Sequence, residues 1–200
     1  MTKVMRPFHC EREMTIEKSA DEVWDWLSDI RNAMTLNQFH ESVEADPSDA
    51  KKGVTVALHH DFCGFKHVRL ARISVWRDFS VGWGERMEDT SIEDPFPHGE
   101  SWTVVPVDKK RCTIKNSLRG AYTGPVGRIV GPHVWPAMFP QILDRDLQEL
   151  AFSVGAISEK REIISPEETY KLHMLMLTQE INGMPADDFL ESGKLIFGGV

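Results

Sequence analysis

Two neighbouring strand candidates in this chain carry charged side chains of types that suit acid–base chemistry. Pairing residues 66–77 with residues 80–88 through a tight turn places Arg72 opposite Glu85, and the same face of the preceding strand carries His59. A carboxylate or imidazole in an apolar environment has its pKa moved toward the neutral range, where it can transfer a proton. We therefore predict Glu85, Arg72 and His59 as catalytic residues. An ion pair of Arg72 and Glu85 on the solvent side is the alternative, because charged side chains are rarely buried.

The strand predicted at residues 54–62 bears on which face of this sheet is the inner one. The face opposite His59 is the more apolar of the two, with Val54, Val56, Leu58 and Phe62. The two hairpins therefore favour different faces, and a β-bulge would reconcile them. We take the face with Arg72, Glu85 and His59 as the inner one.

The last predicted hairpin supplies two polar side chains to a mostly apolar face. A four-residue turn between residues 99–107 and 111–119 pairs Thr103 with Asn116. We predict that both point inward and orient the carbonyl or hydroxyl group of a ligand. The alternative is that they bond to each other or to a buried water, because buried polar groups usually find internal partners.

Four more side chains are predicted to contact a ligand without reacting. Trp83 shares the face of Glu85, Tyr122 follows the last strand and would close one end of a pocket, and two histidines would lie at its mouth. The four predicted contact residues are Trp83, Tyr122, His60 and His98.

The histidine-rich segment 59–67 does not predict a metal site. His59 and His60 are neighbours on a strand, so their side chains point to opposite faces. His60 and His67 would be cross-strand partners, and two ligands need a third. We expect no metal ion and no cofactor.

The elements that must position these residues follow from hydrophobic periodicity and turn chemistry. Ser19 and Glu22 have the spacing of a capping box at the start of a helix. Short connections between the later strands favour an antiparallel meander. The expected elements, in order, are a strand at 8–18, helices at 20–29 and 31–39, a turn at 44–52, strands at 54–62, 66–77, 80–88, 99–107 and 111–119, an irregular segment at 120–136 and a long helix at about 137–156.

This order resembles the helix-grip fold of the START and polyketide cyclase/dehydrase superfamily. Three segments carry the resemblance: Met14–Asp29, Arg72–Trp83 and Leu118–Val130. The resemblance covers about residues 8–156 and implies an α+β fold in which a curved antiparallel sheet wraps a long C-terminal helix, with a ligand cavity between them. The family has no universal catalytic residues, so none is transferred. We expect a helix-grip domain at 1–157 and a C-terminal helical extension at 158–200.

Composition narrows the classes of partner. The net charge of −8 argues against nucleic acid, which rewards basic surfaces. No apolar run approaches the ~20 residues needed to span a bilayer. The N-terminus lacks the apolar region of a secretory signal, and the three cysteines show no pairing motif. We therefore expect a cytoplasmic protein with reduced thiols.

The C-terminal extension is too apolar to stand alone in water. A second capping box at Ser165–Glu168 predicts a helix to about residue 181, and a short helix near 186–192 follows. The extension must pack on the body, cover the cavity mouth or form a homodimer interface. We predict packing on the body and leave the homodimer open.

The predicted function is the binding of a small, largely apolar organic molecule in an internal cavity. The first hypothesis is an enzyme of the polyketide cyclase/dehydratase kind. A non-catalytic carrier or sensor of a lipid-like or aromatic metabolite is the alternative, and a partner-binding protein is a weaker third. Ionisable groups that face an enclosed cavity would favour the enzyme, and a purely apolar cavity would favour the carrier.

Overall fold

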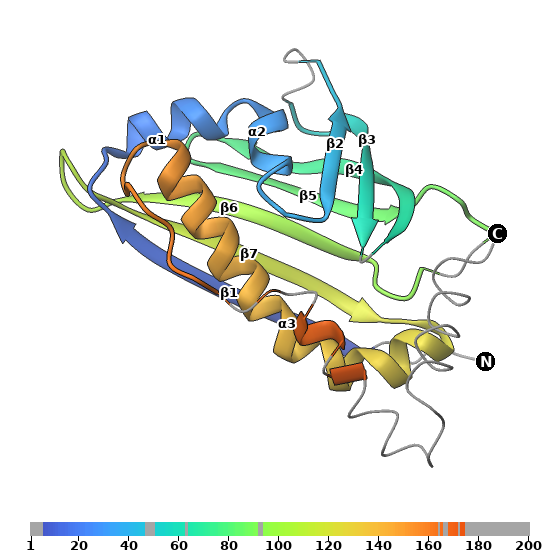
Figure 1. Cartoon of the computed structure of the whole chain (residues 1–200). Helices are drawn as coiled ribbons and strands as arrows, with labels where there is room; N and C mark the ends of the chain where they lie inside the picture. The colour runs from blue at the N-terminus through green and yellow to red at the C-terminus, as the bar shows by residue number, and fades with distance from the viewer. Residues whose placement is uncertain are drawn as a thin grey trace.

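A curved antiparallel sheet packs one face against a long helix in the computed structural model of this chain (Figure 1). The sheet has seven strands in the order β1-β7-β6-β5-β4-β3-β2. Strands β2 to β7 form a meander, and β1 is added at the edge beside β7. The predicted α+β helix-grip architecture is confirmed. The structure describes residues 6–46, 51–62, 64–91, 94–163, 165, 168–171 and 173–174.

The described elements follow the predicted order with one addition. Strand β2, which the sequence did not predict, pairs with β3 at one edge of the sheet. The elements are β1 (Arg6–Ile16), α1 (Ala20–Leu27), α2 (Ile30–Met34), β2 (His40–Glu44), β3 (Thr55–Phe62), β4 (Phe65–Arg77), β5 (Ser80–Met87), β6 (His98–Pro106), β7 (Cys112–Tyr122) and α3 (Gly124–Ser153).

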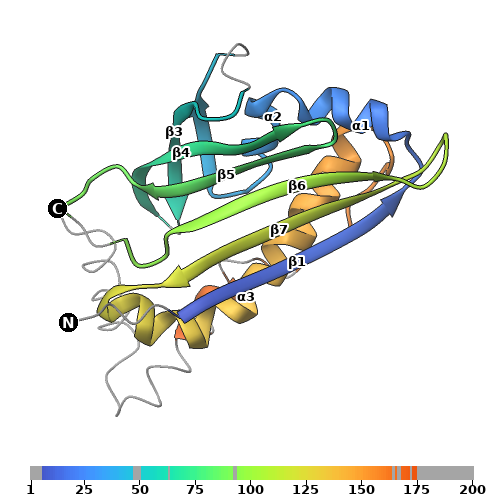
Figure 2. The same ribbon diagram turned by 180° about the vertical axis from the view of Figure 1, so that it is seen from behind.

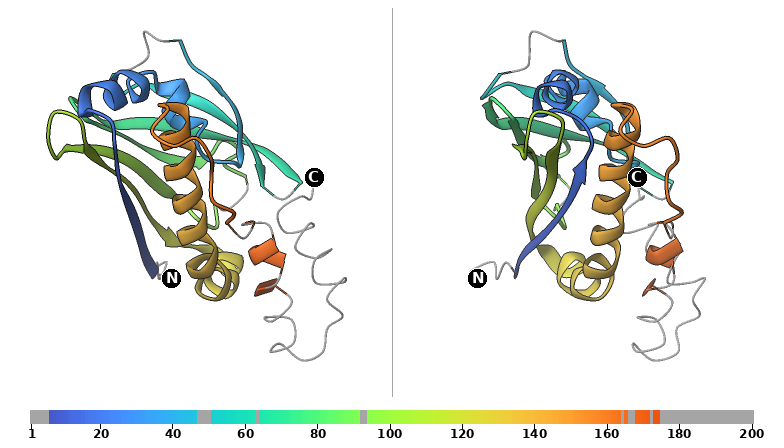
Figure 3. Two further views of the ribbon diagram at one scale, coloured as in Figure 1. Left: turned by 60° about the vertical axis from the view of Figure 1, so that its left-hand side comes forward. Right: turned by 90° about the vertical axis from the view of Figure 1, so that its left-hand side faces the viewer.

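The predicted capping box begins α1. The Glu22 backbone N–H donates to the Ser19 hydroxyl at 3.3 Å, and the Ser19 backbone N–H donates to the Glu22 carboxylate at 3.0 Å. These bonds satisfy donors at the helix start that lack intrahelical partners. Val23 and Leu27 on the opposite face are fully buried. The short helices α1 and α2 lie at the same end of the molecule as the C-terminal end of α3 (Figure 3).

The last helix is longer than predicted. Residues 120–136 were expected to be irregular, but α3 already begins at Gly124 and contains Pro132, Pro136 and Pro140. Each proline removes one backbone donor and crowds the carbonyl four residues earlier, which bends a helix without having to end it. Because the prolines are four residues apart, their effects fall on one side of α3. The first part of α3 runs in a different direction from the rest (Figure 1).

A β-bulge in β4 decides which side chains of that strand face α3. Trp76 pairs with Val81 next to the turn, as predicted, but the register shifts between Ile73 and Val75. Beyond this bulge Ala71, and not Arg72, pairs with Glu85. The prediction that Arg72 lies opposite Glu85 is therefore wrong, and the inner face of β4 carries Arg69, Ala71 and Ile73.

The hairpin of β6 and β7 differs from the prediction by one residue. Pro106, and not Val107, pairs with Cys112, so the connection has five residues instead of four. A one-residue slip transfers every side chain of a strand to the other face. Glu100 and Trp102 of β6 consequently face inward and are almost completely buried. Asn116 keeps its predicted inward orientation because the slip affects β6 alone.

Two apolar clusters fill the space between the sheet and α3. The first joins α1 and α2 to the middle of the sheet and to Leu147, Leu150 and Ala151 of α3. The second gathers aromatic rings near the start of α3. These rings belong to Phe8, Phe39, Phe62, Phe96, Tyr122, Trp135, Phe139 and Tyr170.

The part of the C-terminal extension that the structure describes packs on the body, as predicted. Tyr170 and Met174 are buried in the second cluster, and the ring centroids of Tyr170 and Phe62 are 5.4 Å apart. The Thr169 hydroxyl donates to Gln141 on α3 at 2.7 Å. The predicted helix near 186–192 lies outside the described residues, and the homodimer stays a prediction.

Gly84 and Gly99 are cross-strand partners on the outer face and give a matched test of the sheet. A Cβ at Gly99 would lie 2.9 Å from the Trp83 carbonyl oxygen, whereas a Cβ at Gly84 meets nothing closer than 3.9 Å. We expect Gly99→Ala to lower the free energy of unfolding by about 1–3 kcal/mol, in the range of overpacked sites. Gly84→Ala should change it by less than about 0.5 kcal/mol. Chemical denaturation measures both values, and equal values would contradict this sheet geometry.

None of the helices in the described parts of the chain is both long enough and apolar enough to cross a membrane.

Candidate functional site

Glu85 on β5 is the centre of a buried polar group on the inner face of the sheet. Its side chain is completely shielded from solvent. The Trp83 indole N–H, two residues earlier on the same face, donates to Glu85 Oε1 at 2.7 Å. We call Glu85, Trp83, His40, His60, His98 and Arg69 the Glu85 cluster.

Three imidazoles turn their Nε2 atoms toward the Glu85 carboxylate. His60 Nε2 lies 3.3 Å and His98 Nε2 lies 3.4 Å from Oε2, and His40 Nε2 lies 3.8 Å from Oε1. His40 Nδ1 donates to the Met34 carbonyl oxygen, and His98 Nδ1 donates to the Phe96 carbonyl oxygen at 2.8 Å. A carbonyl can only accept, so Nδ1 carries the proton in both rings. Nε2 then bears a lone pair whenever either ring is neutral.

Arg69 adds a buried cation to the cluster. Its Nε lies 3.3 Å from Glu85 Oε2, and its Nη2 donates to Asp94 Oδ2 at 2.8 Å and to the Phe96 carbonyl oxygen at 3.2 Å. Arg69 therefore has two carboxylate partners, and the contact with Asp94 is the shorter of the two. Ion pairs of this kind are stable in a protein interior only when further hydrogen bonds hold both partners.

Burial and charge set the ionisation of this cluster. Burial lowers the pKa of His60 to about 3 and also lowers the pKa of His98. Burial would raise the pKa of Glu85, but its interactions with His98, His60 and His40 hold it well below the usual range. At neutral pH the cluster therefore holds an ionised Glu85 carboxylate next to neutral His60 and His98.

A second polar group joins the sheet to α3 next to the first. Glu100 on β6 and Asp146 on α3 are both buried, and their carboxyl groups interact electrostatically. We call them the acid pair. The Asn116 amide donates to Glu100 Oε1 at 3.0 Å, whereas both oxygens of Asp146 and the Asn116 Oδ1 have no hydrogen-bond partner in the described parts of the chain.

At neutral pH the carboxyl groups of the acid pair are protonated, whereas the carboxyl group of Glu85 is ionised. Burial and the nearby charge of Glu85 raise the pKa of Glu100 to about 8. Burial and Glu100 raise the pKa of Asp146 well above its usual range. Neighbouring carboxyl groups with pKa values pushed apart are the usual basis for separate acid and base roles.

Three predicted site residues lie on the outer face of the sheet. Arg72 is exposed because of the bulge in β4. His59 lies on the face opposite His60, and its Nε2 is hydrogen-bonded to Glu44 Oε1 at 2.7 Å. Thr103 pairs with Lys115 and faces outward because of the one-residue slip in β6. The inward orientation predicted for these three side chains is wrong.

The other predicted site residues lie on the inner face. Glu85, Trp83, His60 and His98 belong to the Glu85 cluster, and Asn116 contacts Glu100. Tyr122 is buried among the aromatic rings of the second apolar cluster, and its hydroxyl group has no hydrogen-bond partner in the described parts of the chain. Their roles in catalysis or ligand binding stay predictions.

Sequence reasoning missed four charged or ionisable members of these groups, for separate reasons. His40 is the first residue of β2, a strand that the hydrophobic pattern of the sequence did not predict. Arg69 and Glu100 face inward only because of the bulge in β4 and the one-residue slip in β6, neither of which the predicted registers included. Asp146 did leave a signal, because it lies three residues after Leu143 and one before Leu147 on the apolar side of α3.

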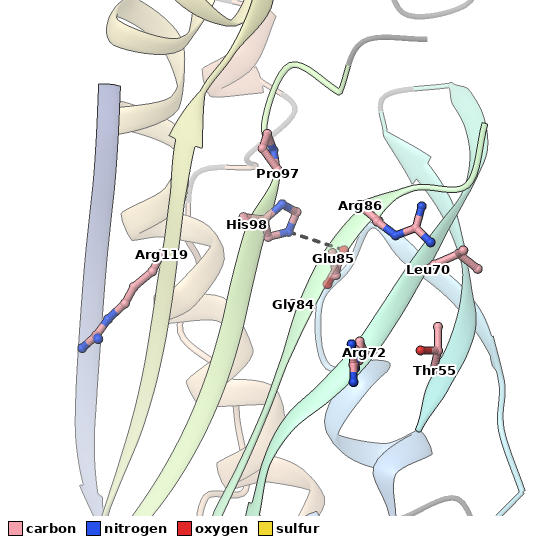
Figure 4. Close-up of a pocket in the computed structure, with 9 residues that line it drawn as sticks. All are labelled: Thr55, Leu70, Arg72, Gly84, Glu85, Arg86, Pro97, His98 and Arg119. Carbon is pink, nitrogen blue, oxygen red and sulfur yellow. Dashed lines mark ion pairs between the residues drawn. The ribbon is translucent and has the colours of Figure 1, made fainter. Parts of the chain in front are cut away.

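The outer face of the sheet is turned toward the viewer in Figure 2. A groove of about 580 Å³ lies on this face, and Figure 4 shows the residues that line it. Its lining residues are Thr55, Leu70, Arg72, Gly84, Glu85, Arg86, Pro97, His98 and Arg119. The predicted internal cavity between the sheet and α3 is a different space and stays a prediction.

The fold is similar to solved structures at low sequence identity. Truncated norcoclaurine synthase from Thalictrum flavum gives a TM-score of 0.55 at 16% identity, with 80% of this chain and 98% of that chain covered. The enzyme from the same plant in complex with dopamine and hydroxybenzaldehyde gives 0.53 at 18% identity, covering 78% and 91%. A START superfamily protein from Mycobacterium smegmatis gives 0.51 at 15% identity, covering 73% and 93%.

No protein-family model and no curated protein matches the chain. At these identities the structural similarity shows the fold and not the activity. The chain therefore has the helix-grip fold shared by START superfamily proteins and norcoclaurine synthase.

Proposed function

We propose that this protein is an enzyme of the cyclase/dehydratase kind that binds a small, largely apolar organic molecule between the sheet and α3. The observation that carries the proposal is the acid pair. Two carboxyl groups from facing elements are buried together, and both oxygens of Asp146 lack a hydrogen-bond partner in the described parts of the chain. Buried polar atoms rarely stay unpaired, so a polar group of a ligand is the natural partner for Asp146.

The protonation of the acid pair suits a proton donor. A group with a pKa near the working pH gives the best compromise between being protonated and giving the proton up. Glu100, with a pKa of about 8, meets this condition. In a dehydration, a protonated carboxyl group gives its proton to the departing hydroxyl oxygen, the carbon–oxygen bond breaks to release water, and a base removes a proton from the neighbouring carbon so that a double bond forms.

The surroundings of the acid pair suit an aromatic or polyketide-like molecule. Trp83 and Trp102 lie on the inner face beside Glu100, and both indole rings are almost completely buried. A norcoclaurine synthase of the same fold has been solved with dopamine and hydroxybenzaldehyde, which are small aromatic molecules with polar groups. A site with apolar walls and a few convergent polar groups is the common form of a small-molecule pocket.

Asp146→Asn tests the proposal, with Asp144→Asn as its matched control. Asp144 lies on the same helix but is part-exposed and pairs with Arg12 at 3.3 Å. Native mass spectrometry of the purified protein first identifies a retained small molecule. We expect Asp146→Asn to lower turnover of that molecule or a close analogue by about 10²–10⁴-fold, the usual contribution of an acid catalyst. Asp144→Asn should stay near the wild-type rate.

Two results would contradict the enzyme proposal. Equal turnover in both variants would remove the acid pair from the reaction. Tight binding without any turnover in the wild-type protein would support the alternative, a non-catalytic carrier or sensor of the same molecule.

A further inference from the structure

We propose that His40, His60 and Glu85 bind a divalent transition-metal ion such as Zn²⁺. The inference goes beyond the acid–base function, because it concerns a different set of residues and is tested by metal binding alone. One ligand atom from each of the three side chains lies within 4.8 Å of the other two. The three residues come from β2, β3 and β5, so only the folded sheet brings them together.

The spacing of the ligand atoms matches a metal site. Around a tetrahedral zinc ion with bonds of about 2.0–2.1 Å, neighbouring ligand atoms are about 3.3 Å apart. His60 Nε2 is 3.3 Å from Glu85 Oε2, and His40 Nε2 is 3.8 Å from Glu85 Oε1. The centroids of the two imidazole rings are 4.3 Å apart, and the ring planes are tilted by 59°. An ion at the open edge of the carboxylate is therefore within reach of both rings after only small adjustments.

Two polar atoms that face this point are buried and form no hydrogen bond of good geometry, although they lie 3.3 Å apart. His60 Nε2 and Glu85 Oε2 have no hydrogen-bond partner in the described parts of the chain, although the residues are only 7% and 3% exposed. The Met34 carbonyl accepts from His40 Nδ1, so Nε2 is the ring nitrogen that is free to bind an ion. A cation between Nε2 and the Glu85 carboxylate would interact favourably with both.

The contact between His40 and Met34 is also typical of a metal ligand. Metal-binding histidines usually donate their other ring N–H to a carbonyl or carboxylate, which fixes the tautomer and the ring orientation. Arg69 Nε also approaches Glu85 Oε2 at 3.3 Å, but the same guanidinium is bound by Asp94 at 2.8 Å, so its charge is shared between two carboxylates. Two imidazoles and one carboxylate leave a coordination position open, as in metal sites that bind a substrate or water.

Equilibrium dialysis of chelator-treated protein against Zn²⁺ or Co²⁺, followed by elemental analysis, tests the proposal. We expect one ion per chain in the wild-type protein. His40→Ala and His60→Ala should each weaken binding by more than about 100-fold, since loss of even an outer partner costs about 10–100-fold. His59→Ala is the matched control: it is the neighbour of His60, points to the other face and pairs with Glu44, so binding should be unchanged.

Thermal unfolding of each variant shows whether it still folds. X-ray absorption at the metal edge of the loaded wild-type protein gives a test that needs no variant, with imidazole nitrogen and carboxylate oxygen ligands expected. The absence of a bound ion in the wild-type protein overturns the proposal. Sulfur ligands, or equal binding by His60→Ala and His59→Ala, place the ion elsewhere and also overturn it.

Discussion

Replacing Glu85 by glutamine is expected to lower the free energy of unfolding by about 3–5 kcal/mol, the usual cost of removing one partner of a buried ion pair. The carboxylate of Glu85 is completely buried and lies 3.3 Å from Arg69 Nε. Glutamine keeps the shape but removes the negative charge, so Arg69 retains Asp94 alone as its counter-charge. The two histidines that face Glu85 Oε2 also lose their ionised partner.

Glu44→Gln is the matched control for this experiment. Glu44 also pairs with a histidine, His59, but its side chain is largely exposed. Exposed ion pairs contribute about 0–1 kcal/mol, because solvent screens the charges. Urea denaturation of the two variants at neutral pH should therefore separate them clearly. A loss below about 1 kcal/mol in Glu85→Gln would mean that Glu85 is not held as a buried charge.

The free energy of unfolding is expected to decrease as the pH rises from 6.5 to 8. Glu100 stays protonated in the folded protein because its pKa is about 8. In the unfolded chain its pKa is near the ordinary value, so the proton is lost there well below pH 6.5. The unfolded state then binds fewer protons than the folded state, and stability falls with rising pH. For Glu100 alone the decrease is up to about 2 kcal/mol across this window, and Asp146 acts in the same direction.

Between pH 6.5 and 8 the effect of the acid pair on stability can be distinguished from the effect of the buried histidines. The pKa of His60 is about 3 in the folded protein, so its contribution to stability is gained between pH 3 and the ordinary histidine value near 6.5. About 0.4 kcal/mol of that contribution is still gained between pH 6.5 and 7.5, after which it is constant. The decrease in stability between pH 6.5 and 8 is larger and opposite in sign, so it comes from the raised carboxyl pKa values.

The slope of the free energy of unfolding against pH measures how many protons are released on unfolding, and Glu100→Gln should reduce that number by about one. Glu88→Gln should leave the slope unchanged, because Glu88 is exposed. Denaturation at several pH values measures the slope for each protein. The variant Glu100→Gln should also be more stable than the wild type at pH 8, since no buried carboxyl remains to ionise at this position. An identical slope in all three proteins would show that Glu100 titrates normally.

The placement of the site residues depended on two details of strand pairing. The sequence indicated that a β-bulge would reconcile the two hairpins but not where it lies, and it did not reveal the longer connection after β6. Ser74 enters β4 as an extra residue, and from there on the strand exposes Arg72 and buries Arg69. The connection after β6 is one residue longer than predicted, which exposes Thr103 and buries Glu100. In both cases each face of the strand carries polar and apolar residues, so the hydrophobic pattern does not select the register strongly.

The sequence by itself determined the order of the elements and the class of fold. The capping box at Ser19 and Glu22, the short turns between strands and the apolar side of the last helix depend on residues close together in the chain, and local patterns predict such features well. The sequence also identified Glu85 as an inward-facing charge.

Only the tertiary structure decided what surrounds Glu85. His40, His60, Arg69 and His98 come from four strands, and Asp146 reaches Glu100 from α3. Their meeting depends on β2, on one bulge and on the packing of α3 against the sheet, which are relations between residues far apart in the chain. Each of these residues alone resembles an ordinary surface residue in the sequence. Their pKa values and their capacity to hold a proton or a metal ion arise only when they are buried together.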